Sequence, residues 1–157
     1  MISLKWCANQ SSGFKLIEPN PNLAEDYSLK AETALESIRT ETAKEWKITK
    51  AYYAMYFSLY SIMMKLGIKC ENHSCSILFM KEILSEFFTL EEYKFLKESM
   101  KARIDSQYYT NRDVSNDFYN SMLKQAPIFL MKCKSIKLSL NEKKIQEIRR
   151  NFEKALK

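Results

Sequence analysis

The stretch AYYAMYFSLYSIMM, Ala51–Met64, carries no charged side chain and is the part of the sequence that decides the fold. It lies within a helix that we predict from about Thr42 to Leu66, with Gly67 as the residue that ends it. Apolar residues occur on nearly every face of this helix, and a helix of that kind is buried between partners. We therefore expect the central helix of a bundle, which is also a candidate dimer seam. The run is too short to cross a bilayer, which takes about 20 residues.

Helical periodicity and capping residues extend on both sides of this stretch, and no strand pattern competes with them. The predicted helices are Asn22 to about Thr40; about Cys75 to Phe88, capped by Asn72 or Ser74; Thr89 to about Tyr108; Ser115 or Asn116 to about Ser135, with a kink at Pro127; and a last one to about Leu156, opened by a capping box at Ser139–Glu142. The fold class is therefore all-α. We divide the chain into an ordered N-terminal extension (1–20), an up-and-down helical bundle of about five to six helices (21–136) and a basic C-terminal helix (137–157) packed on or extending the bundle.

The net charge of +6 is concentrated at the C-terminal end of the chain. Residues 131–157 hold nine Lys and Arg against three Glu, and the rest of the chain is neutral. A basic helix of this kind can contact the phosphates of nucleic acid. A solvated helix face with a few extra lysines is at least as common, so both interpretations stay open.

The four cysteines favour buried thiols, because no spacing among them demands a disulfide framework. Cys70, His73 and Cys75 lie close together, but a zinc site would need a fourth ligand from distant Cys7 or Cys133. We favour a helix start with a packed histidine, and expect no metal and no cofactor. With no secretory signal pattern and no spanning run, we expect a cytoplasmic protein without membrane contact.

The segment RIDSQYYTNR, residues 103–112, gathers the side chains that best suit a site. An arginine at the end of a helix binds phosphate by paired hydrogen bonds, or pairs with an acidic residue and the terminal carbonyls. Two tyrosines from the central stretch are further candidates for stacking on bases, although their spacing is more typical of a core. His73 is the only histidine, and at a helix start it is more often structural. The binding candidates are Arg103, Asp105, Gln107, Tyr108, Tyr109, Arg112, His73, Tyr53 and Tyr56.

The order of these motifs resembles the HEPN domain superfamily, in particular its small stand-alone archaeal and bacterial members. Those members read as an A-Y-Y-A helix, an L-x-x-x-G-like helix end, an H-S segment and R-x-x-A-D-Y. The corresponding residues are Ala51–Ala54, Lys65–Gly67, His73–Ser74 and Arg103–Tyr108. The resemblance covers about residues 23–134, and the N-terminal extension and the last helix fall outside it.

The resemblance implies a helical bundle that forms a homodimer and is often paired with a minimal nucleotidyltransferase in toxin–antitoxin-like systems. Many members are metal-independent ribonucleases whose signature is an Arg followed, after four to six residues, by a His. In this chain Arg103 matches the Arg, but Tyr108, Tyr109 and Thr110 occupy the three offsets of the His. Since tyrosine titrates near pH 10, it is a poor general base.

We therefore expect a binding module for a nucleotide, RNA or a nucleotidyltransferase-fold partner. Arg103 would be its anchor and Tyr108 the companion of Arg103, in a groove at a dimer face formed by the 42–66 and 89–108 helices. The alternative is a divergent ribonuclease that uses Arg103 and Tyr108, with His73 in support. A third reading is a dimer module without a ligand.

Overall fold

The computed structural model describes all 157 residues and contains seven helices and one small sheet. In chain order these are α1 (Leu4–Ala8), β1 (Phe14–Leu16), α2 (Pro21–Ser37), α3 (Lys44–Leu66), β2 (Ile68–Cys70), α4 (His73–Glu82), α5 (Leu90–Tyr108), α6 (Asn116–Ser139) and α7 (Glu142–Leu156). The predicted all-α bundle is confirmed. The one helix that the sequence did not predict is α1, which lies in the segment 1–20 that we expected to be an ordered extension.

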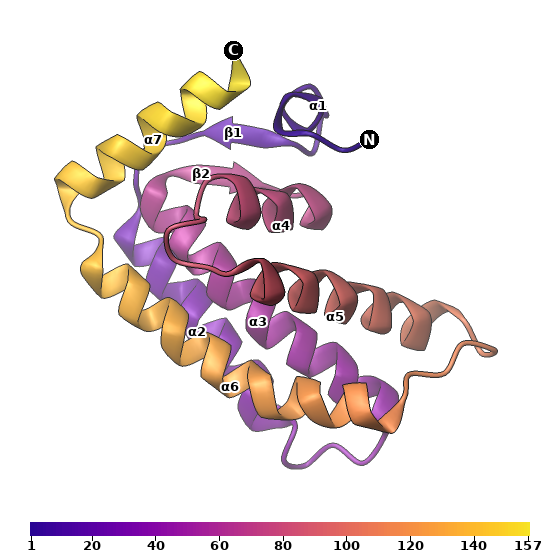
Figure 1. Ribbon diagram of the computed structural model, residues 1–157. Helices are drawn as coiled ribbons and strands as arrows, with labels where there is room; N and C mark the ends of the chain where they lie inside the picture. The colour runs from indigo at the N-terminus through magenta and orange to yellow at the C-terminus, as the bar shows by residue number, and fades with distance from the viewer.

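The α3 helix is the centre of the bundle, as its sequence predicted. Of its 23 residues, 15 are buried, and α2, α5 and α6 all pack against it. Gly67 ends the helix in the left-handed conformation, with φ 72°, which a glycine adopts without strain. Figure 1 shows α3 behind α5 and α6, with α2 alongside it.

The N-terminal segment is more ordered than its sequence indicated. Strand β1 pairs with β2 in antiparallel register, with Phe14 opposite Cys70 and Leu16 opposite Ile68. Our expectation of no strands is therefore wrong at this one place. Each strand has only three residues, too few for an alternating pattern to be detected in the sequence.

A disulfide joins Cys7 of α1 to Cys75 of α4, and both residues are fully buried. The expectation of four buried thiols is thus correct only for Cys70 and Cys133. The sequence did not reveal the pair, because 68 residues separate the two cysteines and only the packing of α1 on α4 brings them together.

Two capping predictions are wrong and three are confirmed, among them the caps of α4 and α6 at Asn72 and Ser115. Asn20, not Asn22, caps α2, and Pro21 occupies its first turn. Ser139 belongs to α6 and donates its hydroxyl to the carbonyl of Ile136, so Asn141 caps α7 instead. The capping box at Thr89 and Glu92 forms as predicted.

Ion pairs attach the basic C-terminal segment to the rest of the molecule. Lys132 pairs with Glu92 at 2.7 Å, and Lys144 pairs with Glu86 at 2.8 Å. Lys134 and Lys137 likewise pair with Glu32 and Glu25, both on α2. Four of the nine cations in this segment therefore balance acidic side chains of the bundle.

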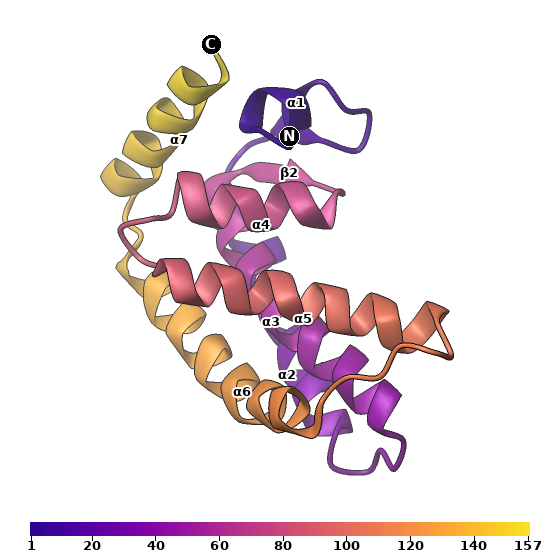
Figure 2. The same cartoon turned by 45° about the vertical axis from the view of Figure 1, so that its right-hand side comes forward.

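The two ends of the chain lie at the same end of the molecule, beside the small sheet. Figure 2 shows α1 above β2 and α4 and α7 to their left, while α5 and α6 run below them. The Lys5 ammonium donates to the backbone carbonyl of Lys157 at 2.7 Å. No helix combines the length and the apolar content needed to cross a membrane.

Candidate functional site

Three helices bring His73, Arg103 and the tyrosines of α3 together in one place. His73 is the first residue of α4, and Asn72 caps that helix by accepting the Cys75 backbone N–H at 3.2 Å. The His73 Nδ1 lies 2.7 Å from the Tyr52 hydroxyl, and the His73 ring stacks on Tyr56 with 3.8 Å between the ring centroids. We call this group, together with Tyr53 and the α5 residues Arg103 and Gln107, the inner cluster.

Burial makes the inner cluster electrically neutral apart from Arg103. The loss of water first, and the positive charge of Arg103 second, lower the pKa of His73 from 6.5 to about 4. Burial likewise raises the pKa values of Tyr52 and Tyr56 well above 10. At neutral pH the imidazole and both phenols are therefore uncharged.

Arg103 is held in place by rings and an amide. Its Cζ lies 5.2 Å from the centre of the Tyr52 ring and 5.5 Å from that of Tyr53. Its Nη1 donates to Gln107 Oε1 at 2.9 Å. The companions of Arg103 are therefore these three residues, in place of the Tyr108 that we expected.

The charge of Arg103 and one of its donors remain unused. The guanidinium has no carboxylate within ion-pair distance. Its Nε–H is buried without a hydrogen-bond partner, as is the Ser99 hydroxyl one turn earlier on α5. Buried donors are nearly always paired in folded proteins, so this pair of unmet donors calls for an explanation.

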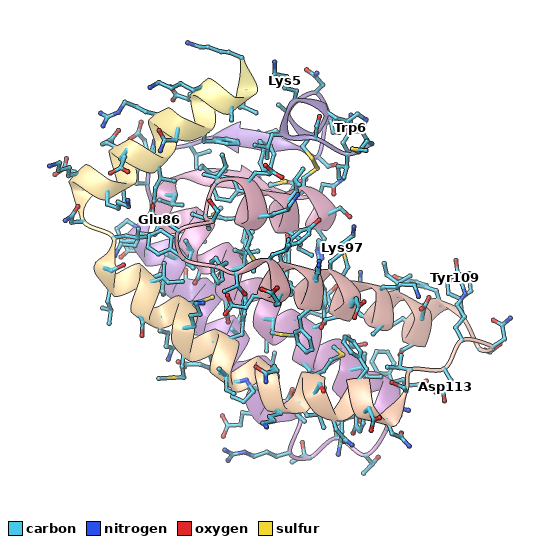
Figure 3. The ribbon with its side chains drawn as sticks, viewed as in Figure 1. Lys5, Trp6, Glu86, Lys97, Tyr109 and Asp113 are labelled. Atoms are coloured by element: carbon cyan, nitrogen blue, oxygen red, sulfur yellow. A yellow bond between two sulfur atoms is a disulfide. The ribbon has the colours of Figure 1, made fainter.

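Three of the other candidates, Tyr108, Tyr109 and Arg112, line a separate, open pocket at the C-terminal end of α5. It has a volume of about 660 Å³, and Figure 3 labels Tyr109 and Asp113 on the loop that projects there. Tyr108 is 71% exposed. The lining residues are Lys44, Glu45, Ile48 and residues 106–114. We call this the outer pocket.

The Arg112 side chain organises the wall of the outer pocket. Its guanidinium lies 3.6 Å above the Tyr109 ring centre, and its Nη1 donates to Asp105 Oδ1 at 3.0 Å. That hydrogen bond is the main reason why the pKa of the buried Asp105 lies below its usual value. Asp105 also pairs with Lys101 at 3.4 Å, so two cations share this carboxylate.

Gln107 belongs to both parts of the site. It lines the outer pocket while its amide oxygen accepts from Arg103. The candidate residues thus fall into two neighbouring groups, with His73, Tyr53, Tyr56 and Arg103 inside and Tyr108, Tyr109 and Arg112 outside. Asp105 accepts a hydrogen bond from Arg112 but does not line the outer pocket.

Sequence reasoning missed Tyr52 and Lys44 as site residues. Tyr52 stands beside Tyr53 in the motif that we quoted, and its i, i+4 spacing to Tyr56 was the available signal. Lys44 donates to the backbone carbonyl of Val114 at 2.6 Å and so closes the pocket against the start of α3. No local pattern indicates that contact, because 70 residues separate the two partners.

The site offers hydrogen-bond donors, stacking surfaces and positive charge, but no cluster of three or more metal-ligating side chains. Cys75 is oxidised in the disulfide, so Cys70, His73 and Cys75 do not form a zinc site. Comparison with known proteins gives no further guide: no family model matches the chain, and no curated protein matches it.

Proposed function

We propose that the protein is a HEPN-like module that binds the phosphate of a nucleotide or of RNA at Arg103. The observation that carries this proposal is the unpaired guanidinium, whose buried Nε–H has no partner. Arginine forms strong, charge-assisted hydrogen bonds with phosphate oxygens. A phosphate that pairs with the guanidinium would balance a positive charge that no carboxylate of the fold neutralises.

The outer pocket supplies what the remainder of a nucleotide needs. Tyr108 and Tyr109 expose ring surface, and base–aromatic stacking tolerates any sequence. Lys44 and Arg112 lie beside them as hydrogen-bond donors, with their charges balanced by Asp113 and Asp105. Gln107 joins this surface to Arg103, so one bound chain of nucleotides can contact both.

The same geometry favours binding over cleavage. Metal-independent cleavage of RNA needs a group that accepts a proton near neutral pH. Tyr108 does not accompany Arg103, and a histidine with a pKa of about 4 is a weak base. We therefore propose that any ribonuclease activity is low.

Binding of fluorescein-labelled single-stranded RNA, measured by anisotropy at low salt, tests the proposal. Arg103→Gln should weaken binding about 10- to 100-fold, because a charged hydrogen bond contributes about 1.5–3 kcal/mol. Arg39→Gln is the matched control, since Arg39 is an exposed arginine just after α2, away from the basic C-terminal helix and without an ion-pair partner. Absence of affinity for both RNA and free nucleotides would refute the proposal.

A second candidate function is a divergent ribonuclease. The observation in its favour is that His73 stands close enough to Arg103 for the arginine charge to lower the histidine pKa. Incubation of RNA with the protein in EDTA decides the question. Cleavage that is lost in Arg103→Ala and in His73→Asn would establish this function, and loss in Tyr108→Phe would show that Tyr108 takes part.

The expected partners are part of the same proposal. A homodimer that joins two α3 and α5 faces would bring two inner clusters together, and light scattering on the purified protein measures its mass. A nucleotidyltransferase-fold partner would co-purify from the source cell. If Arg103→Ala lowers stability and leaves all binding unchanged, the module is a structural dimer without a ligand.

A further inference from the structure

The N-terminal segment, residues 1–17, is fastened to the start of α4 by a covalent bond and by backbone contacts. The Cys7–Cys75 disulfide ties α1 to the first turn of α4, and both sulfur-bearing residues are fully buried. Cys75 lies two positions after His73. The disulfide therefore anchors the backbone on the C-terminal side of the histidine.

Backbone hydrogen bonds anchor the other side of His73. The Ser12 carbonyl accepts the N–H groups of both Glu71 and Asn72 at 3.0 Å. The adjacent Gly13 lies so close to the Cys7 carbonyl that a side chain there would collide with it. The turn after α1 thus folds tightly onto the disulfide-bearing helix and presents Ser12 to the connection that precedes α4.

His73 depends on this backbone for its place in the inner cluster. Asn72, held by Ser12, caps α4 by accepting the Cys75 N–H. The His73 ring then fits between the Tyr52 hydroxyl and the face of Tyr56. A shift of residues 71–75 would therefore alter both contacts of the imidazole.

We propose that the N-terminal segment is a redox-controlled clamp that holds His73 in the inner cluster when the Cys7–Cys75 disulfide is closed and releases it when the disulfide is reduced. The identity of the ligand whose binding is controlled in this way rests on the proposed function. The closed form is the one that binds, because only that form keeps the wall opposite Arg103 in place.

The redox step is thiol–disulfide exchange with a dithiol reductant. A thiolate of the reductant attacks one sulfur, forms a mixed disulfide and displaces the other cysteine as a thiolate. The second thiol of the reductant then releases the first cysteine and leaves as a cyclic disulfide. The protein gains two electrons and two protons, and the dithiol loses them.

Only a small part of the molecule, the helix α1, has to detach to expose the disulfide. Because both cysteines are fully buried, a reductant reaches them only after α1 leaves its site. That helix has five residues, and Trp6 on it is 44% exposed. Figure 3 shows Lys5 and Trp6 on this helix at the edge of the molecule. Short, edge-placed elements are the ones that open locally.

Comparison of the oxidised protein with the same protein in excess dithiothreitol tests the clamp. The single histidine gives one imidazole signal by NMR, and its pKa should rise from about 4 toward 6.5 as water enters. Amide exchange at residues 71–77 should accelerate. If His73 is in place only a tenth of the time after reduction, the RNA dissociation constant rises about tenfold.

A Cys7→Ser variant provides the second arm. It should resemble the reduced protein and should not respond to dithiothreitol. If the imidazole pKa and the amide exchange rates stay the same on reduction, the clamp is overturned, whatever the change in RNA affinity. A histidine that responds in a protein without RNA affinity would uphold the clamp on His73 and refute the proposed ligand instead.

Discussion

The Tyr52 hydroxyl and His73 Nδ1, which lie 2.7 Å apart, join α3 to α4 within the half-buried wall of the site. Tyr52 is fully buried, and its ring also lies beneath Arg103. Tyr52 therefore contacts the histidine through its own hydroxyl and the arginine through the face of its own ring. This arrangement makes Tyr52 a positioning residue for both.

Tyr52→Phe should destabilise the protein by about 1–3 kcal/mol, because it leaves the half-buried imidazole nitrogen without a partner. Urea unfolding followed by circular dichroism measures the change. Tyr53→Phe is the control, since the Tyr53 hydroxyl makes no hydrogen bond in the structure and Tyr53 is only half-buried. Equal losses in the two variants would contradict the role assigned to Tyr52.

Stability should fall as the pH drops from 6.5 toward 4. The folded-state pKa of His73 lies below its unfolded value, so the unfolded chain binds more protons in this window. The stabilisation is complete above pH 6.5 and is lost progressively down to about pH 4. Its size is at most about 3 kcal/mol. Urea unfolding at several pH values measures it, and His73→Asn should flatten the curve in this window.

Arg149→Met should destabilise the fold by about 2–4 kcal/mol. The Arg149 Nη1 donates to the carbonyls of Ile17, Leu66 and Gly67, and so fastens α7 to the end of α3. Arg150→Met, at the neighbouring exposed position, should change stability by no more than about 0.5 kcal/mol. Thermal unfolding of the two variants side by side distinguishes the fastening from general loss of charge.

Gly67→Ala should destabilise the protein by at least about 2 kcal/mol, since the left-handed backbone there disfavours any side chain. A methyl group would also collide with the Arg149 guanidinium and the Ile17 carbonyl. Chemical unfolding gives the magnitude. A loss below about 0.5 kcal/mol, the range of ordinary surface changes, would show that the backbone adapts at this turn.

Tyr108→Ala should weaken RNA binding by about tenfold, the effect of one lost stacking contact. Because Tyr108 is 71% exposed, the substitution should change the free energy of unfolding by less than about 0.5 kcal/mol. Trp46→Ala removes another exposed aromatic ring, on α3 but not in the lining of the outer pocket, and should leave RNA affinity unchanged. Equal weakening by both changes would point to nonspecific binding.

The sequence predicted the bundle because its strongest signal is local. The Ala51–Met64 run, the glycine that ends it and the Thr89–Glu92 box are read within a few residues, and each forms as expected. The caps of α2 and α7 were missed because neighbouring residues offer equivalent capping groups. The choice between them depends on where the preceding chain is held.

The sequence indicated which residues belong to the candidate site better than it indicated how they are arranged. Arg103, His73 and two tyrosines do meet, but Tyr108 faces a different pocket from Arg103. Linear spacing suggested the Arg103–Tyr108 pairing because five residues separate them on one helix. At 100° per residue, five residues place two side chains on different faces, so the helix itself separates them.

By itself, the sequence determined the helical class, the central position of α3 and the residues from which a site can be built, because these follow from periodicity and side-chain chemistry. Tertiary structure alone decided the Cys7–Cys75 bond, the β1–β2 pairing and the contact of His73 with Tyr52. Each joins segments at least 21 residues apart. Only the packing of α1, α3 and α4 in three dimensions brings such pairs within bonding distance.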